Sequence, residues 1–140
     1  MHKIVIDTNV VISGLRSQLG ASYRLLQLIG TGKFEIALSV PLVLEYESVA
    51  KRMKADLGLT ARDIDDTINY FCSVGTAHDI HYLWRPYLTD PKDDMVLELA
   101  LNAHAPIIVT FNTSDFVGAE SFGIKVMTPK EFLIMVKENR

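Results

Sequence analysis

The amino-acid sequence predicts an α/β fold, a three-layer α/β/α sandwich whose central sheet has five mainly parallel strands. Short apolar, β-branched segments alternate with helical patterns along the whole chain, as they do where helices connect parallel strands. No repeat, low-complexity segment or linker interrupts the 140 residues, so we expect a single domain over residues 1–140. Hydrophobic residues make up 49% of the chain, which favours a sizeable core and argues against disorder.

The expected strands cover residues 3–6, 34–38, 76–83, 107–109 and 124–127. The first of them is short, β-branched and apolar on both faces, which is typical of a central strand of a parallel sheet. Stretches rich in polar residues or glycine lie between these strands and the helices. The longest of them predict loops at residues 17–20, 84–89 and 110–115.

The expected helices begin where a side chain can cap the first turn. Capping residues precede four of them: Ser39, Asp90, and the capping-box pairs Thr60–Asp63 and Thr128–Glu131. The helices cover about residues 21–29, 40–54, 61–72, 91–103 and 129–138. A turn over residues 9–14, which Asp7 or Thr8 could cap, follows the first strand.

Composition limits the classes of protein to be considered. The net charge of −3 is not the electrostatic signature of a tight nucleic-acid binder, although clustered metal-binding carboxylates would lower the net charge of a nucleic-acid enzyme. Cys72, the single cysteine, cannot form a disulfide within the chain and suits a reducing cytoplasm. Because a strand begins at Lys3 and no apolar run approaches ~20 residues, we expect neither a signal peptide nor a membrane span.

Acidic and amide residues follow several of the expected strands. Asp7 follows the first strand, and Glu45 lies in the helix after the second. Asp93 lies in the first turn of a later helix, and Asn112 and Asp115 follow the fourth strand. In a doubly wound sheet the functional crevice lies at the carboxyl ends of the strands, where the strand order reverses. We therefore expect these side chains to converge beside the first strand.

Such a cluster has a chemical use. Mg²⁺ and Mn²⁺ prefer oxygen ligands. One or two of these ions can orient a water molecule, lower its pKa and neutralise charge on a phosphodiester. Without the metal, neighbouring carboxylates repel one another, which raises the pKa of at least one of them. The sequence therefore predicts metal-dependent phosphodiester hydrolysis, and a fold that metal binding stabilises.

Each acidic residue also has a structural interpretation. Asp7 could cap the following helix, Asp90 is favoured as a cap, and Asp93 stands where a capping box places its acid. Glu45 could be a solvated helix residue, with Glu47 as a rival, but Glu45 shares a helical stripe with apolar positions and Glu47 does not. A further acid, Asp115, could cap a turn. The basic residues at 51, 52 and 54 predict a solvated helix end or a phosphate-steering patch.

Several segments together resemble the PIN domains, over nearly the whole chain. The resemblance is greatest to the VapC-like ribonucleases, the toxin components of bacterial and archaeal toxin–antitoxin pairs. It rests on Ile-Asp-Thr-Asn-Val-Val-Ile-Ser at 6–13, on residues 39–52 with Glu45, on Asp-Pro-Lys-Asp-Asp at 90–94 with Leu-Glu-Leu-Ala at 97–100, and on Ile-Val-Thr at 108–110 with Asp-Phe at 115–116.

This resemblance implies a compact α/β/α fold and a Mg²⁺- or Mn²⁺-dependent endoribonuclease acting on RNA. It also implies a homodimer, and a small antitoxin whose tail occupies the acidic groove. The family's metal-binding acids fall on Asp7, Glu45 and Asp93. Thr8 and Asn9 match the polar positions that hold the first acid in place.

Two positions of the resemblance keep alternatives. The third acid could be Asp93 or Asp94, and we prefer Asp93 because the family pattern Asp-Pro-x-Asp ends on it. The fourth acid falls near Asn112 or Asp115, and Asp115 is the better acidic candidate.

Two other functions remain open from the sequence. A non-catalytic binding or scaffold domain could keep the same fold, as the modest charge and Asn112 permit. A different doubly wound phosphoryl-transfer enzyme is disfavoured. A haloacid-dehalogenase-like site would require an aspartate two residues after Asp7, where Asn9 stands.

Overall fold

The computed structural model of the chain describes residues 1–80, 88 and 90–138. Its centre is a five-stranded sheet in the order β3-β2-β1-β4-β5, in which every neighbouring pair is parallel. The strands are β1 (His2–Ile6), β2 (Phe34–Leu38), β3 (Thr76–Ala77), β4 (Ile107–Val109) and β5 (Lys125–Met127). The predicted parallel sheet is confirmed.

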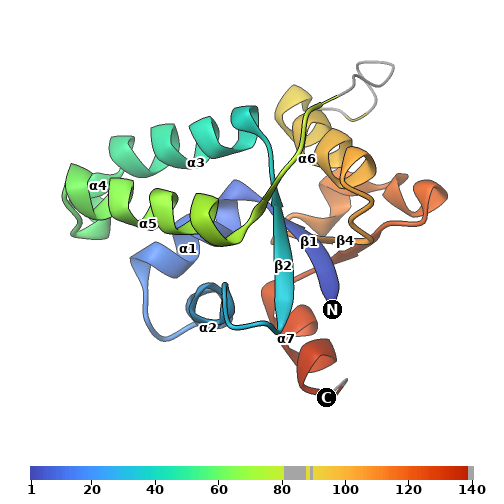
Figure 1. Cartoon of the computed structure of the whole chain (residues 1–140), viewed down its shortest axis with the longest axis horizontal. Coiled ribbons are helices and arrows are strands. Elements are labelled where there is room, and N and C mark those ends of the chain that lie inside the picture. Colours follow the sequence, from blue (N-terminus) through green and yellow to red (C-terminus); the bar gives the residue numbers. More distant parts are fainter. Residues whose placement is uncertain (81–87, 89, 139–140) are drawn as a thin grey trace.

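Helices cover both faces of this sheet, which confirms the three-layer arrangement. Figure 1 shows α3 and α5 on one side of β2 and α6 on the other. The α-helices are α1 (Thr8–Arg16), α2 (Ala21–Leu28), α3 (Val40–Arg52), α4 (Lys54–Leu57), α5 (Ala61–Val74), α6 (Pro91–Asn102) and α7 (Pro129–Glu138). Short 3-10 helices are η1 (Thr113–Phe116) and η2 (Ala119–Phe122). Within the described residues, none of the helices has the length and apolar character needed to cross a membrane.

The predicted helix caps are confirmed. Ser39 accepts a hydrogen bond from the backbone N–H of Leu42 at 3.3 Å. Reciprocal capping boxes start α5 (Thr60 with Asp63) and α7 (Thr128 with Glu131). These bonds favour the ionised carboxylates, and so they lower the pKa of Asp63 and Glu131.

One expected turn, one expected helix and one expected loop differ from the structure. The stretch 9–14 is part of a full helix, α1, rather than a turn. The helix expected over 40–54 ends at Arg52, and α4 follows it as a separate turn that stops at Gly58, which has φ of 68°. Part of the loop expected at 110–115 is the 3-10 helix η1, closed by a bond from the N–H of Asp115 to the carbonyl of Asn112.

The third strand is also shorter than predicted. Among the described residues, Thr76 and Ala77 pair with β2 and the N–H of His78 adds one bond to the carbonyl of Leu38, but residues 78–80 are not in a strand. The remainder of the expected strand, residues 81–83, lies outside the described residues, as does most of the loop expected at 84–89.

The register of the central strands fixes where their polar ends meet. Ile6 of β1 is aligned with Val109 of β4, so the next residues, Asp7 and Thr110, lie side by side at the carboxyl edge of the sheet. β1 lies between β2 and β4, and the chain leaves β1 for β2 on one side and reaches β4 on the other. This is the predicted point of strand-order reversal.

Candidate acidic active site

Asp7 is buried at the carboxyl end of β1, where both of its carboxylate oxygens are held. Oδ1 accepts a hydrogen bond from the backbone N–H of Thr8 at 2.8 Å, and Oδ2 accepts one from Oγ1 of Thr110, also at 2.8 Å. Asp7 is therefore both the N-cap of α1 and a corner of the proposed site. Burial raises the pKa of Asp7 even though both hydrogen bonds act to lower it.

Glu45 reaches the same place from α3. Its Oε2 accepts a hydrogen bond from Oγ1 of Thr8 at 2.7 Å, and its Oε1 lies 3.9 Å from Nζ of Lys92. The rival Glu47 faces another way, because its carboxylate lies 3.9 Å from Nζ of Lys51. The helical spacing thus predicted which of the two glutamates lies on the side of α3 that faces Thr8. Thr8 joins the first two acids, with its backbone N–H on Asp7 and its hydroxyl on Glu45.

The pKa of Asp93 lies well above that of an ordinary aspartate. Burial, followed by the charges of Asp7, Asp90, Asp115 and Asp94, raises the pKa of Asp93 to about 6. The capping-box acids at 63 and 131 have lowered pKa values instead. The direction of its pKa shift therefore distinguishes Asp93 from these two capping acids. Its environment is that of a carboxylate facing other carboxylates.

The acids near Asp93 in the sequence, Asp90 and Asp94, both accept hydrogen bonds from backbone N–H groups. Asp90 is the N-cap of α6, and its Oδ1 accepts a hydrogen bond from the N–H of Lys92 at 3.0 Å. Asp94 is buried, and its Oδ1 accepts a hydrogen bond from the N–H of Leu88 at 2.7 Å. These contacts support the preference for Asp93 over Asp94 as the third acid.

The fourth acidic position of the proposed site falls in the segment after β4. Asp115 is exposed on η1, and its charge raises the pKa of both Asp7 and Asp93. Asn112 approaches through its backbone, whose N–H donates to Oγ1 of Thr110 at 3.1 Å. Asp115 is thus the residue that interacts electrostatically with the other acids.

Asn9 is linked to the first acid through an intermediate residue. Its Nδ2 donates to Oγ1 of Thr110 at 3.4 Å, and its Oδ1 accepts from the N–H of Phe111 at 3.4 Å. Asn9 therefore supports Asp7 through Thr110, whereas Thr8 holds it directly. The amide is well suited to this task because it can donate and accept at once.

The sequence reasoning missed other residues around the site. Thr110 is the first residue after a buried strand, as Asp7 is. This position could have identified Thr110 as a site residue. The buried Tyr46 donates its hydroxyl to the carbonyl of Ile6, immediately before the first acid. Phe111 is 46% exposed, and its backbone N–H bonds to Asn9.

The donor chemistry of the cluster suits a hard divalent cation. Within residues 1–80, 88 and 90–138, no three His, Cys, Asp or Glu side chains are arranged as a ready ligand set. The four acids Asp7, Glu45, Asp93 and Asp115 nonetheless interact through their charges. Carboxylate oxygens are the ligands that Mg²⁺ and Mn²⁺ prefer, and a cation would relieve the repulsion among them.

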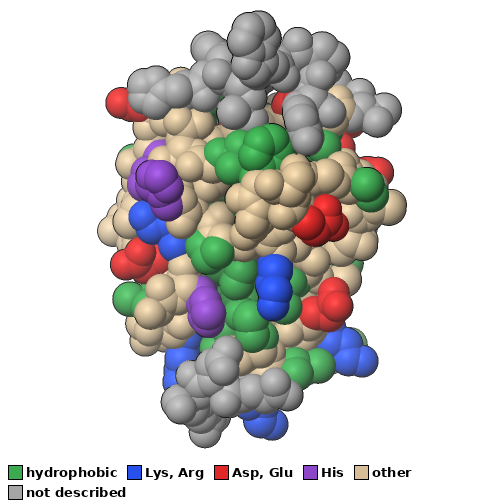
Figure 2. Space-filling view, turned by 90° about the vertical axis from the view of Figure 1, so that its right-hand side faces the viewer, with side chains coloured by type: hydrophobic (Ala, Val, Ile, Leu, Met, Phe, Trp, Pro, Cys, Tyr) green, Lys and Arg blue, Asp and Glu red, His purple; other side chains and the backbone are tan. Residues whose placement is uncertain are grey.

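One face of the molecule has a mixed character. Figure 2 shows this face, on which basic and acidic side chains are scattered among apolar and uncharged atoms. The described residues of this face therefore form no continuous patch of one charge.

Comparisons with known proteins agree with this fold and site. A family model described as "PIN domain" matches residues 3–114, a range that includes Asp7, Glu45 and Asp93 and ends one residue before Asp115. A solved structure described as VapBC2 from Rickettsia felis bound to a DNA fragment from their promoter contains a chain of similar fold. Its TM-score is 0.60 at 14% sequence identity, over 89% of this chain and 96% of that one. None of the curated proteins is similar in sequence at a significant level.

Proposed function

The chain belongs to the PIN-domain family, and from this membership we propose that it is a Mg²⁺- or Mn²⁺-dependent endoribonuclease, the toxin of a toxin–antitoxin pair. One observation carries the proposal. Thr8 links Asp7 to Glu45, and the charge of Asp7 helps to raise the pKa of Asp93 to about 6. Three elements that are distant in sequence thus bring carboxylates to the carboxyl edge of the sheet.

The proposed metal ligands are Asp7, Glu45 and Asp93, with Asp115 or Asn112 in the fourth position. When bound, the ion supplies Lewis acidity that lowers the pKa of water and neutralises charge on a phosphodiester. The chain's own residues orient the ligands, since Thr8 and Thr110 fix the oxygens of Asp7. Because the pKa of Asp93 is raised to about 6, binding a cation at a pH near 6 or below also displaces a proton from the cluster.

Two exposed side chains, one of them beside Glu45, suit a polynucleotide substrate. The Lys92 side chain is 70% exposed and lies next to Glu45, where its ammonium group can contact a phosphate. Phe111 presents a half-exposed ring on which a single-stranded base can stack. RNA, rather than DNA, is proposed because of the resemblance to VapC-like ribonucleases.

The test is a cleavage assay with Mn²⁺ on end-labelled single-stranded and hairpin RNA, paired with calorimetric titration of Mn²⁺. We expect the wild-type chain to cleave and Asp7→Asn to be inactive while remaining folded. Glu47→Gln is the matched control, because Glu47 lies on the same helix as Glu45 but pairs with Lys51. Metal-dependent cleavage that survives in Asp7→Asn would contradict the assignment.

A second candidate is a non-catalytic PIN-fold binding domain. One observation favours it: the described acids do not form a ready three-ligand set. If Mn²⁺ binds but no RNA of the panel is cleaved, this second function replaces the first.

The partners follow from the same proposal. We propose a small antitoxin and a homodimer, supported by the similarity in fold to a chain of the VapBC2 structure. Val40 and Leu44, one turn apart on α3, are exposed apolar residues available to a dimer. Light scattering of the purified chain measures the dimer, and co-purification with the product of an adjacent reading frame tests the antitoxin. A cytoplasmic location, in keeping with the free and exposed Cys72, completes the proposal.

A further inference from the structure

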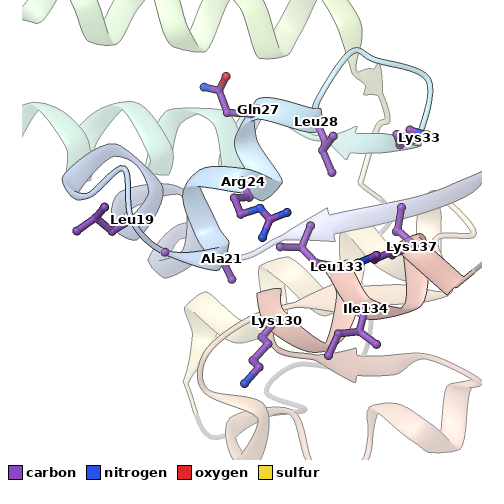
Figure 3. A pocket seen from close by; sticks show the side chains of 12 residues that line it. Leu19, Ala21, Arg24, Gln27, Leu28, Lys33, Lys130, Leu133, Ile134 and Lys137 are labelled. Atoms are coloured by element: carbon purple, nitrogen blue, oxygen red, sulfur yellow. The ribbon is translucent and has the colours of Figure 1, made fainter.

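A groove of about 790 Å³ lies between α2 and α7, and no residue of the acidic site lines it. Figure 3 shows side chains of both helices facing it. Its apolar part includes Leu28, Leu133 and Ile134. At one end lies Leu19, whose side chain is 95% exposed, and Ile134 is itself 48% exposed. The groove therefore offers apolar surface that the chain's own core does not cover.

The groove is also basic. Four cations line it, Arg24, Lys33, Lys130 and Lys137, and no acid among the described side chains does. The whole chain has 14 basic and 17 acidic residues, so this concentration of positive charge runs against the composition. The positive charge comes from three separate segments that meet only in the fold.

We propose that this groove binds an acidic amphipathic helix of a partner protein. The apolar residues of such a helix, spaced three and four apart, would pack on Leu133 and Ile134, and its flanking Asp and Glu would pair with the basic rim. The groove is bounded by helices, and its lining includes no strand edge to which an extended peptide could add. Helical packing is thus the mode that the surface offers.

Charge and lining decide between a protein and a nucleic acid. A single-stranded nucleic acid would use the same cations but would also need aromatic rings for its bases. Among the residues that the structure describes, no Phe, Tyr or Trp lines the groove. An apolar floor with basic edges is instead complementary to a helix with an apolar stripe and acidic flanks.

The experiment uses the full chain and a fluorescein-labelled probe peptide of roughly 16 residues, with Leu at helical spacing and Glu at the other positions. Fluorescence anisotropy should show saturable binding that weakens as NaCl is raised from about 50 to about 200 mM. The double variant Arg24→Glu/Lys130→Glu should bind about tenfold or more weakly. The matched control Arg62→Glu/Lys125→Glu, which reverses two cations outside the groove, should bind as the wild type does.

Two further arms make the result decisive. Ile134→Ser should also weaken binding, because it removes apolar surface without touching the charges, and thermal melts should show that each variant is folded. If a charge-reversed variant is unfolded, Arg24→Gln/Lys130→Gln takes its place. Equal binding of a peptide with Lys in place of Glu, or displacement of the acidic peptide by a 12-mer of oligouridylate, would overturn the proposal in favour of a nonspecific or nucleic-acid surface.

Discussion

Oγ1 of Thr110 donates a 2.8 Å hydrogen bond to Oδ2 of Asp7 across 103 residues of sequence. The bond exists because β1 and β4 pair with Ile6 opposite Val109, so the residues that follow these two are neighbours. The carboxylate of the proposed site is therefore oriented by the same pairing that builds the centre of the sheet. Disrupting the pairing of β1 with β4 would therefore also disrupt the orientation of Asp7.

Thr110→Val should destabilise the fold and shift the activity profile. Valine keeps the shape of threonine but removes the donor to a buried carboxylate, which costs about 1–3 kcal/mol of the free energy of unfolding. The pKa of Asp7 should rise further, so the acidic limb of the cleavage–pH profile should move to higher pH. Urea denaturation and the pH profile measure the two effects. Thr110→Ser should restore both, and a profile that does not move would refute the positioning role.

The metal-free chain should lose stability as the pH rises from about 4 to about 7. The folded-state pKa of Asp93 is about 6, above its ordinary value of 3.8. The stability that Asp93 contributes is therefore fully present below pH 3.8 and is lost as the pH rises through about 6. Asp93→Asn should melt higher than the wild type at neutral pH in EDTA, and its advantage should vanish near pH 4.

Asp63→Asn is the control for this pH dependence. The pKa of Asp63 is lowered by its capping box, so its contribution is present at neutral pH and is lost as the pH falls through the folded-state value. This variant should melt lower than the wild type at pH 7 in the same buffer. Equal melting temperatures of wild type and Asp93→Asn at every pH would mean that Asp93 is not held near other carboxylates.

Lys92→Gln should change metal affinity and RNA affinity in opposite directions. Nζ of Lys92 lies 3.9 Å from the carboxylate of Glu45 and competes with a cation for it. Because the lysine is mostly exposed, the gain in Mn²⁺ affinity should be roughly fivefold or less. The KM for RNA should rise, since a phosphate contact is lost. Calorimetry and steady-state kinetics separate the effects, and Lys54→Gln is a suitable control on an exposed lysine of α4.

Phe111→Ala should raise the KM for single-stranded RNA with little change in kcat. The residue is half exposed and its backbone N–H bonds to Asn9, and loss of the ring should cost about 1–3 kcal/mol of binding if a base stacks on it. Phe122→Ala removes an aromatic ring of similar exposure on η2 and serves as the control. Equal KM values for the two variants would show that Phe111 does not contact the substrate.

Much of the fold was predictable because local signals agreed with one another. The alternation of strand and helix patterns predicted the parallel sheet, and the capping residues Ser39, Thr60 and Thr128 marked helix starts correctly. The same reasoning placed Asp7 at a strand end and Glu45, rather than Glu47, toward it. Both inferences depend only on the periods of strand and helix.

The contacts between distant segments were not predictable in this way. The partner of Asn9 is Thr110, which depends on which strand lies beside β1 and in what register. The length of β3 depends on how far β2 offers it a partner. The basic groove likewise joins α2, α7 and the residue before β2, which no local pattern connects.

The two outer strands of the sheet have a consequence for self-association. β3 has two residues and β5 has three, with an exposed lysine at its start. A sheet edge of this length presents few backbone groups on which another chain could add a strand. β1 lies between β2 and β4, and β3 pairs with Ala37 and Leu38 of β2. The strand order thus keeps the apolar β1 away from the sheet edges, where another chain could add a strand.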